Sequence, residues 1–446
     1  MFSGSKYHRL LILITCIGGF VFNFAFAYPG FIAVDGFDQY QQALANQYND
    51  WHAPIMAYVW HCCLLLHSTT ALMLGFQLAL LWTSIYVLLS TIINRYWYLG
   101  VLLFAFAPFV QNFAGFLVKD AHMAFSWLLV VAILFRRQIM GKRLSGFALP
   151  ACVLLLLYGS WVRINAWPGA FVLSVFVARA IWPKIALKRA FICAMAFTIV
   201  SLITQNLFSY HYLKCDKTYP QAKLFLHDIT GIYAQTGKAY YPSFLFQSPL
   251  FDTAVLRKAY HPATFDHLWV RGNDEKLIYD FDNDSEVNIL KQAWLQAIIQ
   301  HPFAYIHNRF NGLLYYLKLK ESGKPYYAYY FNIAPQPNIM GITQAPSGFR
   351  NVFSNGIIMQ KNMPYMRPWF WVLANVLLLG FLGKFRNTAA AHTYAALLFS
   401  ALAYILPTFL IFPCDSDFRY FYYNAIAATL AFLILLLDRF YFTETT

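Results

Sequence analysis

The residues of this sequence that could carry chemistry are acids, bases and an amide at the ends of long apolar segments. The stretch 35–54, DGFDQYQQALANQYNDWHAP, follows the first such segment, and three later junctions carry further charges. Polar groups so close to hydrocarbon cost free energy, so they usually mark a site or a water-filled cavity. The candidate residues are Asp35, Asp38, His52, Lys119, Asp120, Arg163, Asn165, Arg419 and Tyr420.

This combination suits the transfer of a group from a lipid phosphate. Such a reaction needs a base that takes the proton of the acceptor and cations that hold the departing phosphate. Arginine is well suited to the second task, because its planar guanidinium donates two parallel hydrogen bonds to one phosphate. A carboxylate of ordinary pKa is already ionised at neutral pH and can serve as the base.

Each residue taken alone also has an ordinary structural explanation. A single Asp outside a membrane segment is most often a solvated loop residue or a helix cap, and Asp120 could cap the helix that follows it. Arg163 and Arg419 could reach from an apolar surface to the lipid headgroups, and His52 could pack on Trp51. These explanations weaken when taken together, because acids and bases recur on one face of a bundle whose segments otherwise carry little charge.

The composition indicates a polytopic membrane protein. Of the 446 residues, 59% are hydrophobic and only 12% are charged, which is about half the charged fraction of an average soluble domain. The 43 Phe, 31 Tyr and 12 Trp suit a chain with many rings at the headgroup level. The net charge of +14 is explained by basic loops on one side of a membrane, so no nucleic-acid partner is expected.

Ten apolar runs have about the length that crosses a bilayer, and the Lys and Arg residues set their orientation. The run 53–66 decides the topology. If it crossed the membrane, the basic clusters at 136–143 and 184–189 would lie outside, whereas a short helix on the outer surface leaves them inside. We therefore expect the second arrangement, with crossings at 10–28, 71–93, 98–113, 121–135, 146–161, 167–182, 190–208, 368–382, 392–411 and 425–437.

This topology predicts an all-α polytopic fold in three parts, in the plasma (bacterial inner) membrane, with both termini in the cytoplasm. Residues 1–209 form a transmembrane catalytic module with a first outer loop at 29–70. Residues 210–367 form a small outward-facing, periplasmic domain, and residues 368–446 hold the last transmembrane helices. The first run has no convincing cleavage site, so we expect it to stay uncleaved.

The outer domain is expected to be rich in helices. Apolar residues repeat at helical spacing after a cap at Asp284/Ser285 and again after Pro302, which predicts two amphipathic helices lying on the membrane surface or on the bundle. The seven cysteines form no recognisable disulfide framework or zinc pattern. Cys215 and Cys414 both fall on the outer side, and a disulfide between them stays open.

Five elements of the sequence resemble the membrane-embedded GT-C glycosyltransferases. An Asp shortly after the first crossing is followed by an aromatic, basic, x, Pro element, WHAP at 51–54, which opens the surface helix. VKDAH at 118–122 and WVRIN at 161–165 come next, and DFRYFYY at 417–423 resembles a late Arg-Tyr element of the family. WLQAIIQHPFAYIHNR at 294–309 resembles a stretch found among bacterial relatives. The chain is thus similar to the protein O-mannosyltransferases and the lipid A aminoarabinose transferases.

The resemblance implies transfer of a sugar from a polyprenyl-phosphate carrier to an acceptor lipid, glycan or protein on the outer side of the membrane. In the family the acid of the first loop is the catalytic base, which implies Asp35, with Asp38 as the rival. The family often has Lys where this sequence has His52, and a neutral imidazole is a poorer partner for a phosphate.

The other candidates receive their roles from the same resemblance. Lys119, Arg163 and Arg419 are the expected phosphate ligands, and Asn165 and Tyr420 the expected neighbours of the substrate. Asp120 is expected to orient the acceptor or to pair with one of the cations. No cofactor is predicted with certainty, and a divalent metal shared by the three candidate carboxylates stays open.

Other classes of protein remain as alternatives. A membrane transporter or flippase of a lipid-linked or anionic substrate would place its charges near the bilayer midplane on broken helices, often in repeated halves. A lipid-phosphate hydrolase or phosphotransferase could use the same basic surface with a nucleophile. A scaffold protein would leave the charges on the outer face unexplained. The clustering at one face, without a visible repeat, favours the glycosyltransferase.

Overall fold

The computed structural model describes residues 6–440, apart from 248–250, 266–267, 269, 272–274, 277–280, 282, 322–330, 332–341, 343–344, 346 and 412–415. The described chain is almost entirely helical. Its strands are the antiparallel pair β1 (Val270–Arg271) and β2 (Glu275–Lys276). Cys414, and with it any pairing with Cys215, lies outside the described residues.

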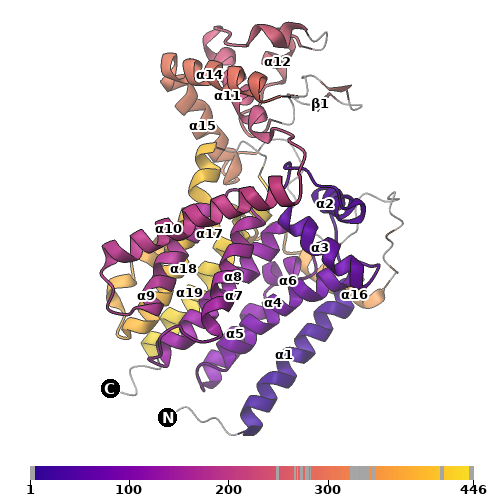
Figure 1. The fold of residues 1–446 in the computed structure, drawn as a ribbon. Helices are drawn as coiled ribbons and strands as arrows, with labels where there is room; N and C mark the ends of the chain where they lie inside the picture. Colours follow the sequence, from indigo (N-terminus) through magenta and orange to yellow (C-terminus); the bar gives the residue numbers. More distant parts are fainter. Residues whose placement is uncertain are drawn as a thin grey trace.

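The first half of the chain forms most of a helical bundle (Figure 1). Two short helices, α2 and α3, pack against each other between the first long helix and α4. The elements are α1 (Lys6–Ala27), α2 (Val34–Ala45), α3 (Ile55–Leu66), α4 (Ala71–Leu89), α5 (Arg95–Ala105), α6 (Pro108–Ala114), α7 (Lys119–Ile139), α8 (Ala148–Trp161), α9 (Trp167–Ile181), α10 (Leu187–Asn206) and the π-helical turn η1 (Leu207–Tyr212).

The C-terminal part of the chain completes the bundle. Its last helix packs against α5, α7, α17 and α18, so segments more than 300 residues apart share one core. Figure 1 shows the start of α1 and the end of α19 at the same end of the bundle. The elements are α16 (Gly348–Ile358), η3 (Pro364–Met366), α17 (Pro368–Leu379), η4 (Leu382–Lys384), α18 (Thr388–Ile411), η5 (Phe418–Phe421) and α19 (Tyr422–Phe440).

A second group of helices projects from the opposite end of the bundle and is called the outer unit here (Figure 1). It contains α11 (Pro220–Thr236), η2 (Ser243–Gln247), α12 (Thr253–Ala259), α14 (Asp284–Gln300) and α15 (Pro302–Tyr316). Buried Leu226, Ile229 and Leu290 belong to its own hydrophobic core, separate from that of the bundle. Inside that core Asp228 accepts hydrogen bonds from Trp294 Nε1 at 2.8 Å and from Arg309 Nη2 at 2.5 Å, which join α11, α14 and α15.

Six helical segments of the described residues are long and apolar enough to cross a membrane: α1, α4, α7, α10 with η1, α18, and η5 with α19. The pair α5 and α6 passes the same test together, although a 54° bend separates the two helices. Four further apolar helices, α3, α8, α9 and α17, are shorter. The described fold is therefore almost entirely helical, with six segments, or seven with the bent pair, that could cross a membrane.

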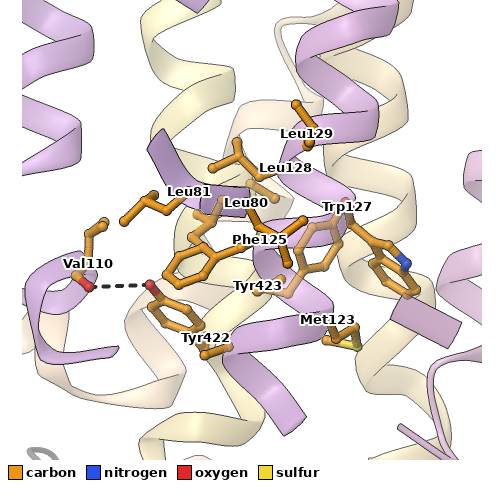
Figure 2. Close-up of a cluster of buried hydrophobic side chains, with 14 of the residues drawn as sticks. Leu80, Leu81, Val110, Met123, Phe125, Trp127, Leu128, Leu129, Tyr422 and Tyr423 are labelled. Atoms are coloured by element: carbon orange, nitrogen blue, oxygen red, sulfur yellow. Dashed lines mark hydrogen bonds between the residues drawn. The ribbon is translucent and has the colours of Figure 1, made fainter. Parts of the chain in front are cut away.

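Helix α7 occupies the centre of the bundle and is fixed by aromatic packing. Phe125 and Trp127 lie among side chains of α4 and α19, and the Trp127 ring meets the Tyr423 ring edge-on at 4.9 Å (Figure 2). A Cβ atom on Gly159 of α8 would lie 2.5 Å from Trp127 Nε1, so α8 can approach only because that position has no side chain. This packing sets where the first turn of α7, with Lys119 and Asp120, can lie.

The expected cap of α14 is wrong by one residue, and the alternative role of Asp120 as a helix cap is not adopted. Helix α14 is capped by Asn283, whose side chain accepts from Glu286 N at 2.9 Å, so Asp284 lies inside the first turn. Asp284 is still favourable there, because a carboxylate complements the positive end of the helix dipole. Helix α7 follows Val118 and has no side-chain cap, since Asp120 faces Arg163 instead.

Candidate functional site

The candidate site lies at the end of the bundle that meets the outer unit, where five separate segments converge. Helices α2 and α7 contribute their first turns, and η5 contributes the turn before the last helix. The loop before α3 and the turn between α8 and α9 complete the set. The residues brought together are Asp35, His52, Lys119, Asp120, Arg163, Arg419 and Tyr420.

Asp35 is the carboxylate on which most of these contacts converge. Its Oδ2 accepts a hydrogen bond from Arg419 Nη1 at 2.6 Å and lies 3.6 Å from Lys119 Nζ, and its Oδ1 lies 4.0 Å from His52 Nε2. Burial raises the pKa of Asp35, but the positive charges of Arg419 and Lys119 outweigh burial and hold this pKa well below its usual value. The side chain still has 28% of its surface exposed, so an ionised oxygen can be reached from outside.

His52 accepts a hydrogen bond from Lys119. Lys119 Nζ lies 2.6 Å from His52 Nδ1, and an ammonium group can only donate, so this ring nitrogen must carry a lone pair. Burial first, and then the charge of Lys119, lower the pKa of His52 to about 3, so the ring is neutral near pH 7. Its remaining hydrogen is on Nε2, on the side of Asp35. His52 thus orients the cation of Lys119 and supplies none itself.

Asp120 and Arg163 form a second, sealed ion pair. Their side chains are 1% and 8% exposed, with Arg163 Nη2 3.0 Å from Asp120 Oδ1. Arg163 Nε donates to the Tyr404 hydroxyl at 3.3 Å, and the guanidinium lies 5.0 Å from the centre of the Tyr420 ring. In the described part of the chain, Arg163 is the ion-pair partner of the Asp120 carboxylate, which makes no well-aligned hydrogen bond. Asp120 therefore fixes Arg163.

Arg419 is shared between two carboxylates. Besides Asp35, its guanidinium meets Asp417, with Nε 2.8 Å from Oδ2, and Asp417 also caps η5 by accepting from Arg419 N at 3.0 Å. The next residue, Tyr420, stacks on Tyr316 at the end of α15, with ring centroids 5.8 Å apart and 10° between the planes. The outer unit thus contacts the turn that carries Arg419.

The charges of the cluster balance. His52 is neutral, so the cluster has equal numbers of carboxylates and cations. An anionic ligand must compete with a carboxylate of the protein for a cation, and Asp35 is the most exposed of the three, at 28% against 17% for Asp417 and 1% for Asp120. The charged members are Asp35, Asp120, Asp417, Lys119, Arg163 and Arg419.

Two of the predicted residues lie at the edge of this arrangement. Asp38, on the next turn of α2, accepts a hydrogen bond from Gln42 Nε2 at 2.8 Å. Burial raises the pKa of Asp38, and the nearby charge of Asp35 adds to the rise, although the Gln42 hydrogen bond opposes it. Asn165 is partly buried in the turn two residues after Arg163.

Two other polar residues of the same segments hold the fold together. Asp50 accepts hydrogen bonds from Tyr210 Oη at 2.8 Å and from the Thr218 amide and hydroxyl at 2.6 and 2.7 Å. These contacts tie the first outer loop to the segment that enters the outer unit. His122 is buried inside the bundle, with Nδ1 3.0 Å from the Tyr158 hydroxyl.

The geometry of the site can also be compared with the alternative of a divalent metal held by Asp35, Asp38 and Asp120. Among the described residues, no three His, Cys, Asp or Glu side chains lie close enough together to hold a metal ion. Asp35 and Asp120 each face an arginine instead.

Sequence reasoning missed two aromatic members of the site, Tyr316 and Tyr404. Tyr316 is on the outer unit and Tyr404 lies in the middle of the apolar helix α18. Neither stands beside a charged motif, so no local signal separates them from the other 29 tyrosines of the chain. Only the packing of α15 and α18 beside η5 shows their place.

Comparison with known proteins adds no family assignment, because no protein-family model, curated protein or solved structure matches the chain.

Proposed function

We propose that this protein is a GT-C-type glycosyltransferase that moves a sugar from a polyprenyl-phosphate donor to an acceptor at the outer face of the membrane. The observation that carries the proposal is the partly exposed, ionised carboxylate of Asp35 held between Arg419 and Lys119 at one end of a transmembrane bundle. A base beside two cations is what the reaction needs at the sugar carbon and at the phosphate.

In this reaction Asp35 accepts the proton of the acceptor while the acceptor atom bonds to the anomeric carbon of the sugar. The bond between that carbon and the phosphate oxygen breaks, and its electron pair leaves with the polyprenyl phosphate. Arg419 and Lys119 stabilise the charge that grows on this phosphate. Arg163 is the third expected cation, and it reaches this phosphate only if it leaves its sealed pair with Asp120.

The pairing of Arg419 with Asp35 gives donor binding a second role. A phosphate that shares Arg419 weakens the contact that keeps the pKa of Asp35 well below its usual value. The carboxylate then becomes more basic at the moment when the donor is in place. Asp417 stays bound to Arg419 and keeps its guanidinium in the site during this change.

The proposal includes a membrane arrangement. The six long helical segments, the bent pair and the short helices α8, α9 and α17 give ten crossings, with α3 lying on the outer surface. The transmembrane module 1–209, the periplasmic domain 210–367 and the C-terminal helices 368–446 follow from it. Both termini are then cytoplasmic, and the membrane is the bacterial inner membrane. The basic residues near the inner ends of the helices support this orientation.

The test is consumption of a donor by the purified full-length protein in detergent and in sealed proteoliposomes, where crossing of the membrane can also be followed. A panel of polyprenyl-phosphate sugars is offered with lipid and glycan acceptors, and release of polyprenyl phosphate is measured. Turnover of at least one donor is the expected result. If no donor binds, the proposal fails. If donors bind and cross the membrane without losing their sugar, the protein is a flippase.

A further inference from the structure

A second polar surface lies at the far end of α7 and is unrelated to the candidate site. A groove of about 450 Å³, here called the inner groove, is formed by α4, α7, the α7–α8 turn and the start of α8. Its volume is within the range of small-molecule sites. It is lined by Val87, Ile133, Arg136, Arg137, Met140, Lys142, Phe147, Ala148 and Ala151.

Its position corresponds to the opposite membrane surface. Lys119 and Arg136 are 17 residues apart on the same helix, and at 1.5 Å per residue this places them about 26 Å apart along the axis. The hydrocarbon core of a bilayer is about 30 Å thick. With Lys119 at the outer mouth, Arg136 therefore reaches the level of the headgroups on the other side.

The inner groove combines cations with an apolar wall. Arg136, Arg137 and Lys142 contribute three positive charges, and no carboxylate is among the lining residues. One guanidinium is partly anchored, since Arg136 Nη1 donates to Ser90 Oγ at 2.8 Å. This differs from the candidate site, where every cation faces a carboxylate.

The aromatic and aliphatic residues of the groove suit a lipid. Phe147 is 88% exposed at the start of α8, a ring at the depth where interfacial aromatics contact headgroups. Val87 and Ile133 continue the surface from there towards the membrane interior, so an acyl chain can extend along them. The amino end of α8 has no side-chain cap at Phe147, and its backbone N–H groups add partial positive charge to the same place.

We propose that the inner groove binds the phosphate headgroup of an anionic membrane phospholipid, with an acyl chain lying against Val87 and Ile133. Basic pockets between transmembrane helices on the cytoplasmic side recognise anionic headgroups in this way. The inference is independent of the proposed sugar transfer. A zwitterionic phospholipid carries a cation that the three positive charges repel, so the groove selects phosphatidylglycerol over phosphatidylcholine.

The experiment measures phospholipid bound to the full-length protein by native mass spectrometry during titration with phosphatidylglycerol or phosphatidylcholine. The test variant is Arg137→Gln with Lys142→Gln. The matched control is Arg143→Gln with Lys188→Gln, which removes one Arg and one Lys from exposed positions at the same end of the bundle but outside the groove.

The wild type is expected to bind phosphatidylglycerol in preference to phosphatidylcholine. The groove variant should lose about thirtyfold in phosphatidylglycerol affinity, because each of the two cations that line the groove contributes about 1 kcal/mol to the bound headgroup and 1.4 kcal/mol corresponds to a factor of ten. Lys142→Gln alone, at an exposed position, should lose about fivefold by the same conversion. The control pair should change the affinity less than about threefold.

Two results would overturn the proposal. Equal losses in the groove and control variants would show that the net charge of this membrane side attracts the lipid. Equal wild-type affinities for the two phospholipids would show that the groove does not recognise an anionic headgroup.

Discussion

Two aspartate–arginine pairs in this molecule are nearly identical in length and differ in almost everything else. Asp35 and Arg419 are 2.6 Å apart at the mouth of the bundle, and Asp228 and Arg309 are 2.5 Å apart inside the outer unit. The Asp228 side chain is 1% exposed and also accepts from Trp294, whereas the Asp35 side chain is 28% exposed.

The difference shows what separates a structural ion pair from a binding site. Asp228 is closed off by three helices of one packed unit, so its charge has no access to a ligand. Asp35 lies in the first turn of the short helix α2. The nearest ion-pair partner of its Oδ1 is His52, at 4.0 Å, and a second cation, Lys119, lies 3.6 Å from its Oδ2. Exposure and a neighbouring cation distinguish the site, and the length of the salt bridge does not.

Breaking the buried Asp228–Arg309 pair should have the largest effect on stability. Asp228→Ala removes the buried carboxylate that Arg309 and Trp294 contact, and loss of one member of a buried pair costs about 3–5 kcal/mol. The free energy of unfolding, followed by chemical denaturation and Trp fluorescence, should fall by that amount. Asp284→Ala, which breaks the exposed pair between α14 and Lys217, should cost less than about 1 kcal/mol. Equal effects of the two variants would contradict the distinction between buried and exposed pairs.

Breaking the partly exposed Asp35–Arg419 pair should lower the affinity for the donor instead. Arg419→Gln removes a charge-assisted contact to the donor phosphate, worth about 1.5–3 kcal/mol, so donor affinity should fall about tenfold to a hundredfold. The measurement is binding of polyprenyl phosphate by the purified variant. Arg95→Gln, at an exposed position in the bundle, is the matched control and should leave the affinity unchanged. An unchanged affinity in Arg419→Gln would remove this residue from phosphate binding.

The neutral state of His52 predicts how the stability of the folded protein depends on pH. The folded-state pKa of about 3 lies below the unfolded value of about 6.5, so the unfolded chain binds more protons between these limits. Stability should therefore fall as the pH drops from about 6.5 towards 3. His52→Gln should reduce this slope by about 1.4 kcal/mol per pH unit, measured by denaturation at several pH values. An unaltered slope would mean that His52 is not held neutral.

The smallest effect is expected at the rival carboxylate. Asp38 is bound to Gln42 and lies outside the ion pairs of the site, so Asp38→Asn should reduce the turnover number less than about fivefold, well short of the loss of a general base. A reduction of about a thousandfold at this position would transfer the role of the base from Asp35 to Asp38.

The sequence predicts that the charged residues of the site lie on one side of the bundle, but it does not predict which acid pairs with which cation. The positions of Lys119, Arg163 and Arg419 at the ends of apolar segments were enough to place them on one side of a bundle, because the positive-inside rule orients each segment. Which acid each cation meets depends on how the helices pack. Asp35 and Arg419 are 384 residues apart, and no pattern in either neighbourhood predicts their contact.

Local structure shows the same limit. No helix is predicted between the first crossing and residue 53, although Val34–Ala45 forms α2 and places Asp35 and Asp38 one turn apart. The sequence predicts the cap of α14 at Asp284/Ser285, although Asn283 is the cap, because all three residue types are good caps and only backbone geometry decides between neighbours. Tyr316 and Tyr404 gain their roles only from the approach of α15 and α18.

The central claim is that Asp35 is the base of sugar transfer, and the most direct measurement is the turnover number of Asp35→Asn with the donor that wild type consumes. Asn is nearly isosteric with Asp but carries no charge, so it forms no ion pair with Lys119 or Arg419. Donor binding therefore serves as the control for an intact site. A general base contributes about 10²–10⁴ in rate, so the variant should lose about a thousandfold in turnover while it still binds polyprenyl phosphate. Wild-type turnover in Asp35→Asn would contradict the account.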